Sequence, residues 1–172
     1  MRWNRIALAG ALLIGCGDAE PFDTVDSLEV TGEDLDRCMN DWPQVGLMRI
    51  TNLLGDVDAS VAVAESPTGG VYPPGTLIQL FPGEAMLKRE EGWNAMTNDW
   101  EFFTLDAQVD GVTIAARGAE DTINMFGGSC FECHSLAEDP WDFVCGDDNG
   151  CDPLPVGEDF IRSLQNGDPR CR

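Results

Sequence analysis

The chain has 172 residues and a formal net charge of −21, because 31 acidic side chains face only 10 lysines and arginines. So negative a charge argues against nucleic acid as a partner, since phosphate backbones are bound by clustered basic side chains. The length and the apolar content fit a single domain with one core. A basic protein is the partner that such a surface would attract, and an evenly solvated surface without a partner is the alternative.

The first fifteen residues have the pattern of an export signal. Two arginines precede an apolar run over residues 6–15, which is too short to span a bilayer. The run ends in the sequence LIGC at residues 13–16, which resembles the lipobox of bacterial lipoproteins. We therefore predict that residues 1–15 are a signal peptide, that Cys16 carries the lipid, and that the protein is anchored in the bacterial cell envelope, facing the periplasm or on the outer membrane. An ordinary secretory signal with an incidental cysteine is the alternative.

Residues 16–30 mix Gly, Pro, Asp and Glu without hydrophobic periodicity, which indicates an acidic tether before a single domain over residues 31–172. A short helix that begins near Thr31 is predicted to extend to Cys38. A strand over residues 45–54 is expected next.

Proline and glycine punctuate the middle of the chain. A loop rich in both residues covers residues 67–75. Two strands are predicted after it, over residues 76–81 and 84–88, on either side of the Pro82-Gly83 turn.

The clearest local signal is a β-hairpin. Segments 100–109 and 112–117 flank Asp110-Gly111, a dipeptide that suits the left-handed conformations of a two-residue turn. Because successive strand residues alternate sides, Phe102 and Leu105 must point to opposite faces. The hairpin is therefore predicted to contribute to two environments, the core and a binding pocket.

Two helices are predicted in the remainder of the domain. Residues 120–126 are expected to form one, which ends at Gly127-Gly128. Residues 158–165 are expected to form an amphipathic helix with Phe160, Ile161 and Leu164 turned inward. The predicted fold class is therefore α+β, an antiparallel β-sheet with flanking short helices.

The most informative motif is Cys130-Phe131-Glu132-Cys133-His134, which joins two thiols to the only histidine of the chain. It is the attachment signature of a c-type haem, in which the thiols add to two vinyl groups and the imidazole binds the iron. A redox dithiol and half of a zinc site are the alternatives. Zinc would need a second ligand pair at matching spacing, and a thioredoxin-like site a preceding β-α-β pattern, and the sequence has neither. We predict one covalent haem c, attached through Cys130 and Cys133, with His134 as the axial ligand.

The number of cysteines supports this division of roles. If Cys16 carries lipid and the motif holds haem, four of the seven cysteines remain. Four thiols in an oxidising compartment predict two disulfides, for which three pairings exist. We favour Cys145–Cys151, which closes a short loop, and Cys38–Cys171, which would join the two ends of the domain. The acidic loop between Cys145 and Cys151 lacks the full ligand spacing of a calcium loop.

Several segments, in order, resemble the family of cytochrome P-460 and cytochrome c′-beta, which are periplasmic mono-haem proteins. Ordinary class I cytochromes c are instead helical and carry CxxCH near their start. The residues that carry the resemblance are Tyr72 to Leu80, Glu84 to Lys88 with Trp93, Trp100 to Phe103, Cys130 to His134 and Asp139 to Val144. The resemblance implies an antiparallel sheet with haem against one face, a histidine ligand from the late motif, an iron that is five-coordinate and, in many members, a homodimer.

One departure from the family concerns lysine. Members that oxidise hydroxylamine tie a lysine to the porphyrin edge, and the matching position here is Leu80, which cannot form that bond. Lys88, the only lysine of the chain, matches a different family lysine that is not cross-linked. Glu84 matches a carboxylate that accepts protons on the distal side, and Arg49 matches a pocket arginine. An exposed charge beside a turn and a surface strand cation are the alternatives for these two residues.

The predicted function follows from the distal side of the haem. Apolar side chains at Leu80, Phe102 and Phe103 would make a dry space that favours small diatomics such as nitric oxide over anions. Ligation by a methionine, which would give a simple electron carrier, is the alternative. The five candidates are Met39, Met48, Met86, Met96 and Met125. We expect a haem protein that binds gas or transfers electrons, with a hydroxylamine or nitric oxide oxidoreductase as the second hypothesis.

Overall fold

The computed structural model describes residues 28–146 and 149–171. The predicted signal peptide, Cys16 and nearly all of the predicted tether lie outside the described residues. Among the described residues, no helix has the length and apolar character needed to cross a membrane.

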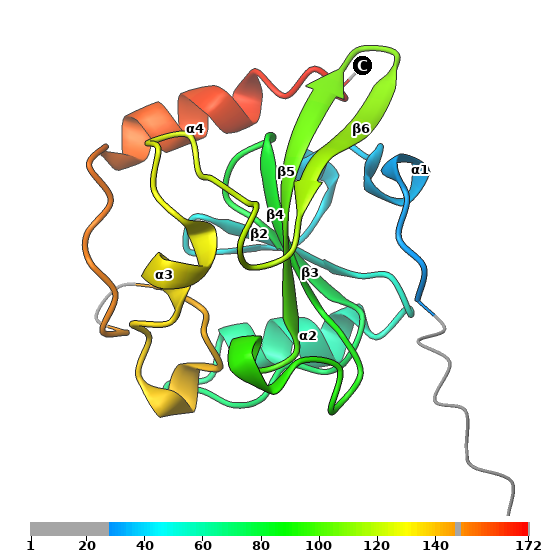
Figure 1. Ribbon diagram of the computed structural model, residues 1–172. Helices are drawn as coiled ribbons and strands as arrows, with labels where there is room; N and C mark the ends of the chain where they lie inside the picture. The colour runs from blue at the N-terminus through cyan, green and yellow to red at the C-terminus, as the bar shows by residue number, and fades with distance from the viewer. Residues whose placement is uncertain (1–27, 147–148, 172) are drawn as a thin grey trace, which may run out of the picture.

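The fold is built on one antiparallel sheet whose six strands are ordered as they occur in the sequence (Figure 1). The strands are β1 (Gln44–Val45), β2 (Met48–Asn52), β3 (Thr76–Gln79), β4 (Glu84–Lys88), β5 (Trp100–Gln108) and β6 (Gly111–Arg117). The helices are α1 (Gly32–Leu35), α2 (Val57–Ala64), α3 (Cys130–His134) and α4 (Glu158–Asn166), with short 3-10 turns η1 (Met39–Asp41), η2 (Ala95–Thr97) and η3 (Asp139–Trp141). The predicted α+β class, with an antiparallel sheet and short helices, is confirmed.

Side-chain alternation along the strands divides the interior into two clusters, one on each face of the sheet. On β5, Phe103 and Leu105 belong to the first cluster, together with Leu35 and Met39 from the α1 side. Phe102 belongs to the second cluster, which also contains Cys130. The hairpin therefore serves two environments, as its alternation predicts.

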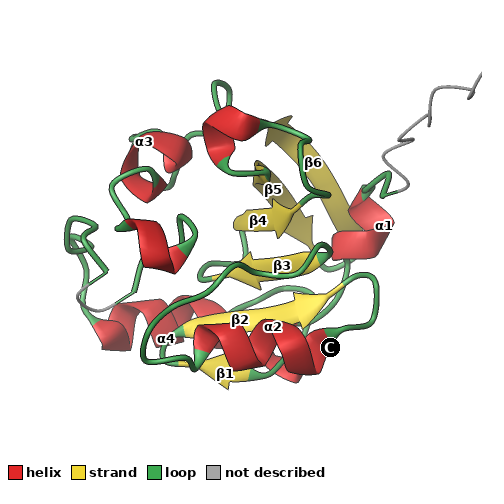
Figure 2. Cartoon of the chain, turned by 90° about the horizontal axis from the view of Figure 1, so that it is seen from below, coloured by secondary structure: helices red, strands yellow, loops and turns green. Residues whose placement is uncertain are grey.

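The second face of the sheet is the one that carries the motif. Helix α2 packs on this face and lies along β2 in Figure 2. Ser60 of α2 is fully buried and lies 3.1 Å from the Asn52 amide nitrogen and 2.7 Å from the Thr76 hydroxyl. This helix was not predicted from the sequence. Small apolar residues give it little amphipathic contrast, and polar contacts with the sheet hold it in place.

Several predicted elements differ in extent or kind. The helix expected from Thr31 to Cys38 ends at Leu35. The hairpin turn lies at Val109-Asp110 in place of Asp110-Gly111. The strand expected over residues 45–54 is divided by a turn at Gly46, whose positive φ of 58° suits glycine. The helix expected over residues 120–126 does not form. There the Thr122 hydroxyl donates to the Gly118 carbonyl, and the Asn124 side chain accepts from two backbone N–H groups. Such local side-chain bonds compete with the helical ones.

The C-terminal helix α4 forms where predicted, but its inward face is different. Ile161 is buried and Leu164 half-buried, whereas Phe160 is exposed. Gln165 takes the inward position, because its amide donates to the carbonyls of Leu47 and Leu80. These two hydrogen bonds join α4 to the chain just before β2 and just after β3.

Both favoured disulfides are present. Cys38–Cys171 joins the first helical segment to the C-terminal end, and Cys145–Cys151 closes a local loop. The two cysteines of the motif are the free ones among the described residues.

Candidate functional site

The motif forms the one-turn helix α3, which begins after Ser129. The Ser129 hydroxyl accepts a hydrogen bond from the Glu132 N–H at 3.2 Å and so caps the helix. Cys130 is buried against the second cluster, and Cys133 is half-buried. The two thiols therefore project from one short, capped turn beside the sheet.

His134 has a fixed orientation. Its Nδ1 lies 2.7 Å from the backbone carbonyl oxygen of Phe143. A carbonyl can only accept, so Nδ1 carries the hydrogen and Nε2 keeps its lone pair in the neutral ring. Burial lowers the pKa of His134, and the Phe143 carbonyl acts in the opposite direction with a smaller effect. The ring is therefore neutral and offers Nε2 as a metal ligand.

A series of aromatic rings extends from this imidazole. The Phe102 ring centroid is 5.4 Å from that of His134 and 6.2 Å from that of Phe131. Phe131 in turn lies 6.2 Å from Phe143. The motif thus faces an apolar environment that suits the flat, largely hydrophobic body of a porphyrin.

Glu84 is the predicted acidic residue of the site. It is the first residue of β4 and faces the motif side of the sheet, since Met86, two residues later, belongs to the second cluster. Its Oε1 accepts a hydrogen bond from the Met125 N–H at 2.6 Å. Burial raises the pKa of Glu84, and the bond from Met125 offsets part of this effect.

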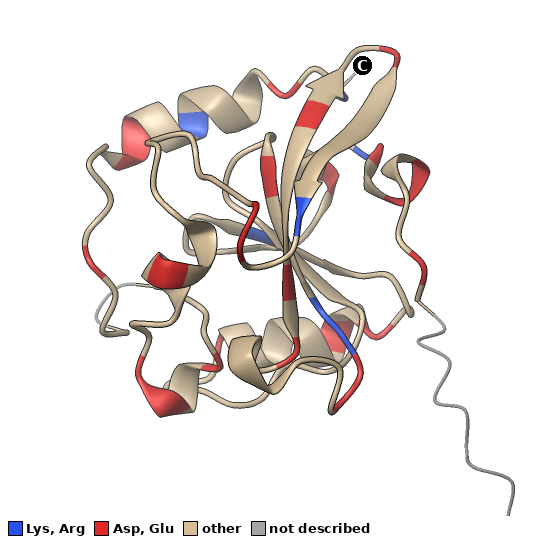
Figure 3. Cartoon of the chain, in the orientation of Figure 1, with Lys and Arg blue, Asp and Glu red and all other residues tan. Residues whose placement is uncertain are grey.

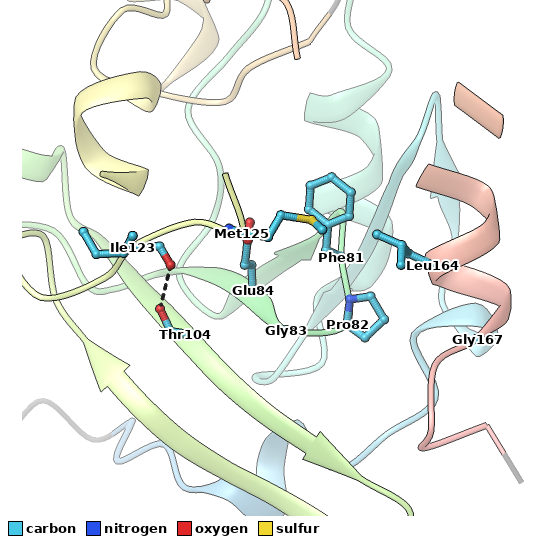
Figure 4. Close-up of a pocket in the computed structure, with 9 residues that line it drawn as sticks. All are labelled: Phe81, Pro82, Gly83, Glu84, Thr104, Ile123, Met125, Leu164 and Gly167. Carbon is cyan, nitrogen blue, oxygen red and sulfur yellow. Dashed lines mark hydrogen bonds between the residues drawn. The ribbon is translucent and has the colours of Figure 1, made fainter. Parts of the chain in front are cut away.

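A cavity of about 340 Å³ opens beside Glu84 (Figure 4). It is lined by Phe81, Pro82, Gly83, Glu84, Thr104, Ile123, Met125, Leu164 and Gly167. Apart from Glu84 and the Thr104 hydroxyl, these side chains are apolar. No residue of the motif lines this cavity. Glu84, which does line it, acts on the motif through its charge: burial, and then the charge of Glu84, raise the pKa of the Cys130 thiol to about 11.

The structure brings some of the predicted site residues together and separates others. Phe102 contacts His134. Leu80, just after β3, is half-buried, and because it is two residues from Ile78 of the second cluster it faces the same side of the sheet. Phe103 lies in the first cluster, across the sheet from the motif. Phe103 is therefore not placed to line a pocket at His134, because adjacent strand residues point to opposite faces.

Arg49 is separated from the motif for the same reason. Its neighbour Ile50 belongs to the second cluster, so alternation turns Arg49 to the other face. There its Nη1 reaches the Trp42 carbonyl at 3.4 Å. The expected role of Arg49 as a pocket cation does not fit this position.

The methionines divide in the same way. Met39 is buried in the first cluster, and Met96 is exposed in η2. Met48 and Met86 lie on the motif face, and Met125 lines the cavity. Position alone therefore limits a methionine ligand to these last three residues.

Two residues without a predicted role, Asp142 and Phe143, follow the motif in the sequence, and Phe143 contacts His134. Phe143 supplies the carbonyl that orients the imidazole, and Asp142 precedes it in an unusual left-handed conformation. The sequence feature that could have indicated both residues is the segment Asp139 to Val144, which resembles the pattern of the cytochrome P-460 and c′-beta family.

The donor set fits haem better than a protein-held metal ion. Within residues 28–146 and 149–171, one group of three or more potential metal ligands converges, and it consists of Cys38, Asp168 and Cys171. Two of those are joined in a disulfide. In the part of the chain that the structure describes, the thiols and the imidazole of the motif belong to no such group, whereas zinc would require one. Two free thiols, a neutral oriented imidazole and aromatic surroundings are what covalent haem needs.

Comparisons of the chain with protein-family models, curated proteins and solved structures give no match. The chemistry and the placement of the motif residues are therefore the basis for a function.

Proposed function

We propose that this protein is a mono-haem c-type cytochrome that binds a small diatomic gas such as nitric oxide, transfers electrons, or does both. Cys130 and Cys133 attach the haem, and His134 is its axial ligand. One observation carries the proposal: the single histidine of the chain directs its Nδ1 to a backbone carbonyl and leaves Nε2 free, next to the two unpaired thiols of CxxCH. The resemblance of several segments of the chain to the cytochrome P-460 and c′-beta family supports the same assignment.

The attachment chemistry needs no further reactant from the chain. Each thiol adds across a vinyl double bond, so that sulfur bonds to one carbon and the thiol hydrogen goes to the other. No group leaves and no oxidant is consumed. When bound, the haem supplies reversible ligand binding at iron and one-electron chemistry.

The chain's own residues determine what approaches the iron. The second axial position cannot be filled by another histidine, because the sequence has one. Phe102 packs against the imidazole itself and so would border the histidine side of the haem. Leu80, an apolar side chain on the motif face, would favour uncharged ligands over anions. Leu80 also excludes the lysine cross-link of the hydroxylamine-oxidising relatives.

A second candidate, oxidation of hydroxylamine, is favoured by Glu84. This carboxylate lies on the motif face, at the edge of a cavity, with its pKa raised by burial. A carboxyl group with a raised pKa is a better proton acceptor at neutral pH than an exposed one, and oxidation of hydroxylamine releases protons. We rank this function second because the chain lacks the cross-linking lysine.

We propose further that the protein is held at an envelope membrane and that its redox partner is basic. A lipid on Cys16 would hold the domain at an envelope membrane through the segment over residues 16–30. Acidic side chains occur on helices, strands and loops all around the fold (Figure 3), rather than in one patch. This distribution supports general electrostatic attraction of a basic redox partner over a shaped acidic docking site. A homodimer follows from the family resemblance alone.

The decisive experiment is production of the full chain in a host with haem-maturation machinery, followed by intact mass and absorption spectra with and without nitric oxide. We expect one haem and one lipid modification, ordinary c-type bands and a stable nitric oxide complex. The Cys130→Ser/Cys133→Ser variant is the control and should carry lipid without covalent haem. Colourless wild-type protein would overturn the proposal, whereas hydroxylamine turnover with a red-shifted Soret band would establish the second candidate.

A further inference from the structure

We infer that Lys88 and Asp142 form a positioning pair, which holds the Phe143 carbonyl at His134 and thereby fixes the tautomer and orientation of the proposed iron ligand. The inference rests on the proposed function for its consequence at iron. The geometry behind it, however, belongs to the protein alone.

Both oxygens of the Asp142 carboxylate accept hydrogen bonds. Its Oδ1 accepts hydrogen bonds from Lys88 Nζ at 2.7 Å and from the Asn98 amide. Its Oδ2 accepts from the Tyr72 N–H at 2.8 Å, and its backbone carbonyl accepts from Trp100 Nε1 at 2.6 Å. Four donors, from β4, from β5 and from the loops before β3 and β5, therefore converge on one residue, which is only 2% exposed.

These bonds support a backbone conformation that residues with side chains rarely adopt. Asp142 and Phe143 have φ values of 50° and 61°, so two consecutive residues with side chains are left-handed. This conformation is unfavourable for any residue with a Cβ and persists where surrounding contacts impose it. The tight reversal turns the Phe143 carbonyl back to His134 Nδ1, at 2.7 Å.

Lys88 supplies the charge of the pair. It is 5% exposed on β4, and its second hydrogen bond goes to the Asn98 carbonyl at 2.7 Å. The ammonium group also lies 5.3 Å from the centre of the Trp100 ring. A buried ion pair gives little net stability compared with an apolar pair of the same size, which makes a positional role the better account of it.

The consequence for the site follows from the covalent link between Asp142 and Phe143. A shift of the Asp142 carboxylate moves the next carbonyl away from His134. The imidazole can then turn over or change tautomer, and a ligand whose second nitrogen loses its acceptor is a weaker donor to iron. Lys88 and Asp142 are positioning residues, because their hydrogen bonds go to residues outside the motif and they act on His134 through the Phe143 carbonyl.

The test begins with the full mature chain produced without haem, where the single histidine gives one unambiguous set of imidazole nitrogen resonances. Wild type should show His134 protonated at Nδ1. Lys88→Met should give a mixture of both tautomers in place of one, and Lys88→Arg should restore the wild-type pattern. Arg162→Met is the matched control, because Arg162 forms an exposed ion pair with Glu158 on α4.

The haem-loaded protein provides the second readout. The iron–histidine stretching frequency of the ferrous form should fall in Lys88→Met and stay unchanged in Arg162→Met. If Lys88→Met does not fold, the double variant Lys88→Met/Asp142→Asn, in which no charge is left unpaired, decides the question by the same measurements.

The two proposals can fail separately. Folded Lys88→Met or double-variant protein with wild-type histidine resonances would overturn the positioning role, whether or not haem binds. Wild-type protein that takes up no haem would overturn the proposed function. The positioning role would still stand if Lys88→Met changed the histidine resonances of the haem-free protein.

Discussion

Phe102 and Phe103 are adjacent on β5 but belong to different interiors. The Phe102 ring lies 5.4 Å from His134, whereas the Arg117 guanidinium lies 5.3 Å from the centre of the Phe103 ring. Both are almost completely buried, at 1% and 0% exposure. One residue therefore borders the proposed haem site, and the other supports only the opposite core.

This relationship gives a prediction with a built-in control. Phe102→Ala and Phe103→Ala should each lower the free energy of unfolding by about 3–5 kcal/mol, since each removes a buried ring. Only Phe102→Ala should change the absorption spectrum and the dissociation rate of nitric oxide. Chemical denaturation and stopped-flow spectroscopy measure the two effects. Equal spectral changes in both variants would place the haem elsewhere.

The two disulfides should differ in their contribution to stability. Cys38–Cys171 closes a loop with a sequence separation of 133, and Cys145–Cys151 one with a separation of 6. Loop entropy predicts that the first contributes roughly 5 kcal/mol and the second roughly 2 kcal/mol. Urea denaturation of Cys38→Ser/Cys171→Ser and Cys145→Ser/Cys151→Ser should reproduce this order. Because Cys38 and Cys171 lie away from α3, their loss should leave the haem spectrum of the folded protein unchanged.

Local signals in the sequence predicted much of this fold. The Pro82-Gly83 turn depends on neighbouring residues and forms where expected. The β-hairpin also forms, but its turn lies one residue earlier than predicted, at Val109-Asp110, and Gly111 is the first residue of β6. Strand positions also follow from alternation. Which face a strand presents to the motif does not, because a shift of one residue reverses it. For this reason Phe103 and Arg49 were expected at a site from which the sheet separates them.

Long-range contacts account for what the sequence did not predict. The Lys88–Asp142 pair joins residues 54 positions apart, and no local pattern indicates it. The same holds for α2, which polar contacts with Asn52 and Thr76 hold against the sheet. Such partners become visible only when the chain is folded.

Glu84 should make the stability of the domain depend on pH. Burial raises its pKa in the folded state above the value in the unfolded chain. The folded state therefore binds more protons between these two pKa values, and stability falls as pH rises through that window. Glu84→Gln should flatten the decline, as measured by urea denaturation between pH 4 and pH 8. Glu158→Gln, on the exposed face of α4, is the control and should leave the slope unchanged.

The Cys130 thiol should be unusually unreactive in the chain before haem attachment. Burial and the charge of Glu84 raise its pKa from 9.0 to about 11, so the thiolate fraction at pH 8 is about a hundredfold below that of an ordinary thiol. Alkylation of haem-free Cys133→Ser protein should be slower by at least this factor than alkylation of the same protein unfolded in urea. Glu84→Gln should accelerate the folded reaction, because it removes a negative charge that opposes ionisation. The acceleration should be only a few-fold, since burial is the larger cause and remains. A folded protein in which Glu84→Gln leaves the rate unaltered would show that this carboxylate does not act on the motif, and it would remove the main support for the hydroxylamine-oxidising alternative.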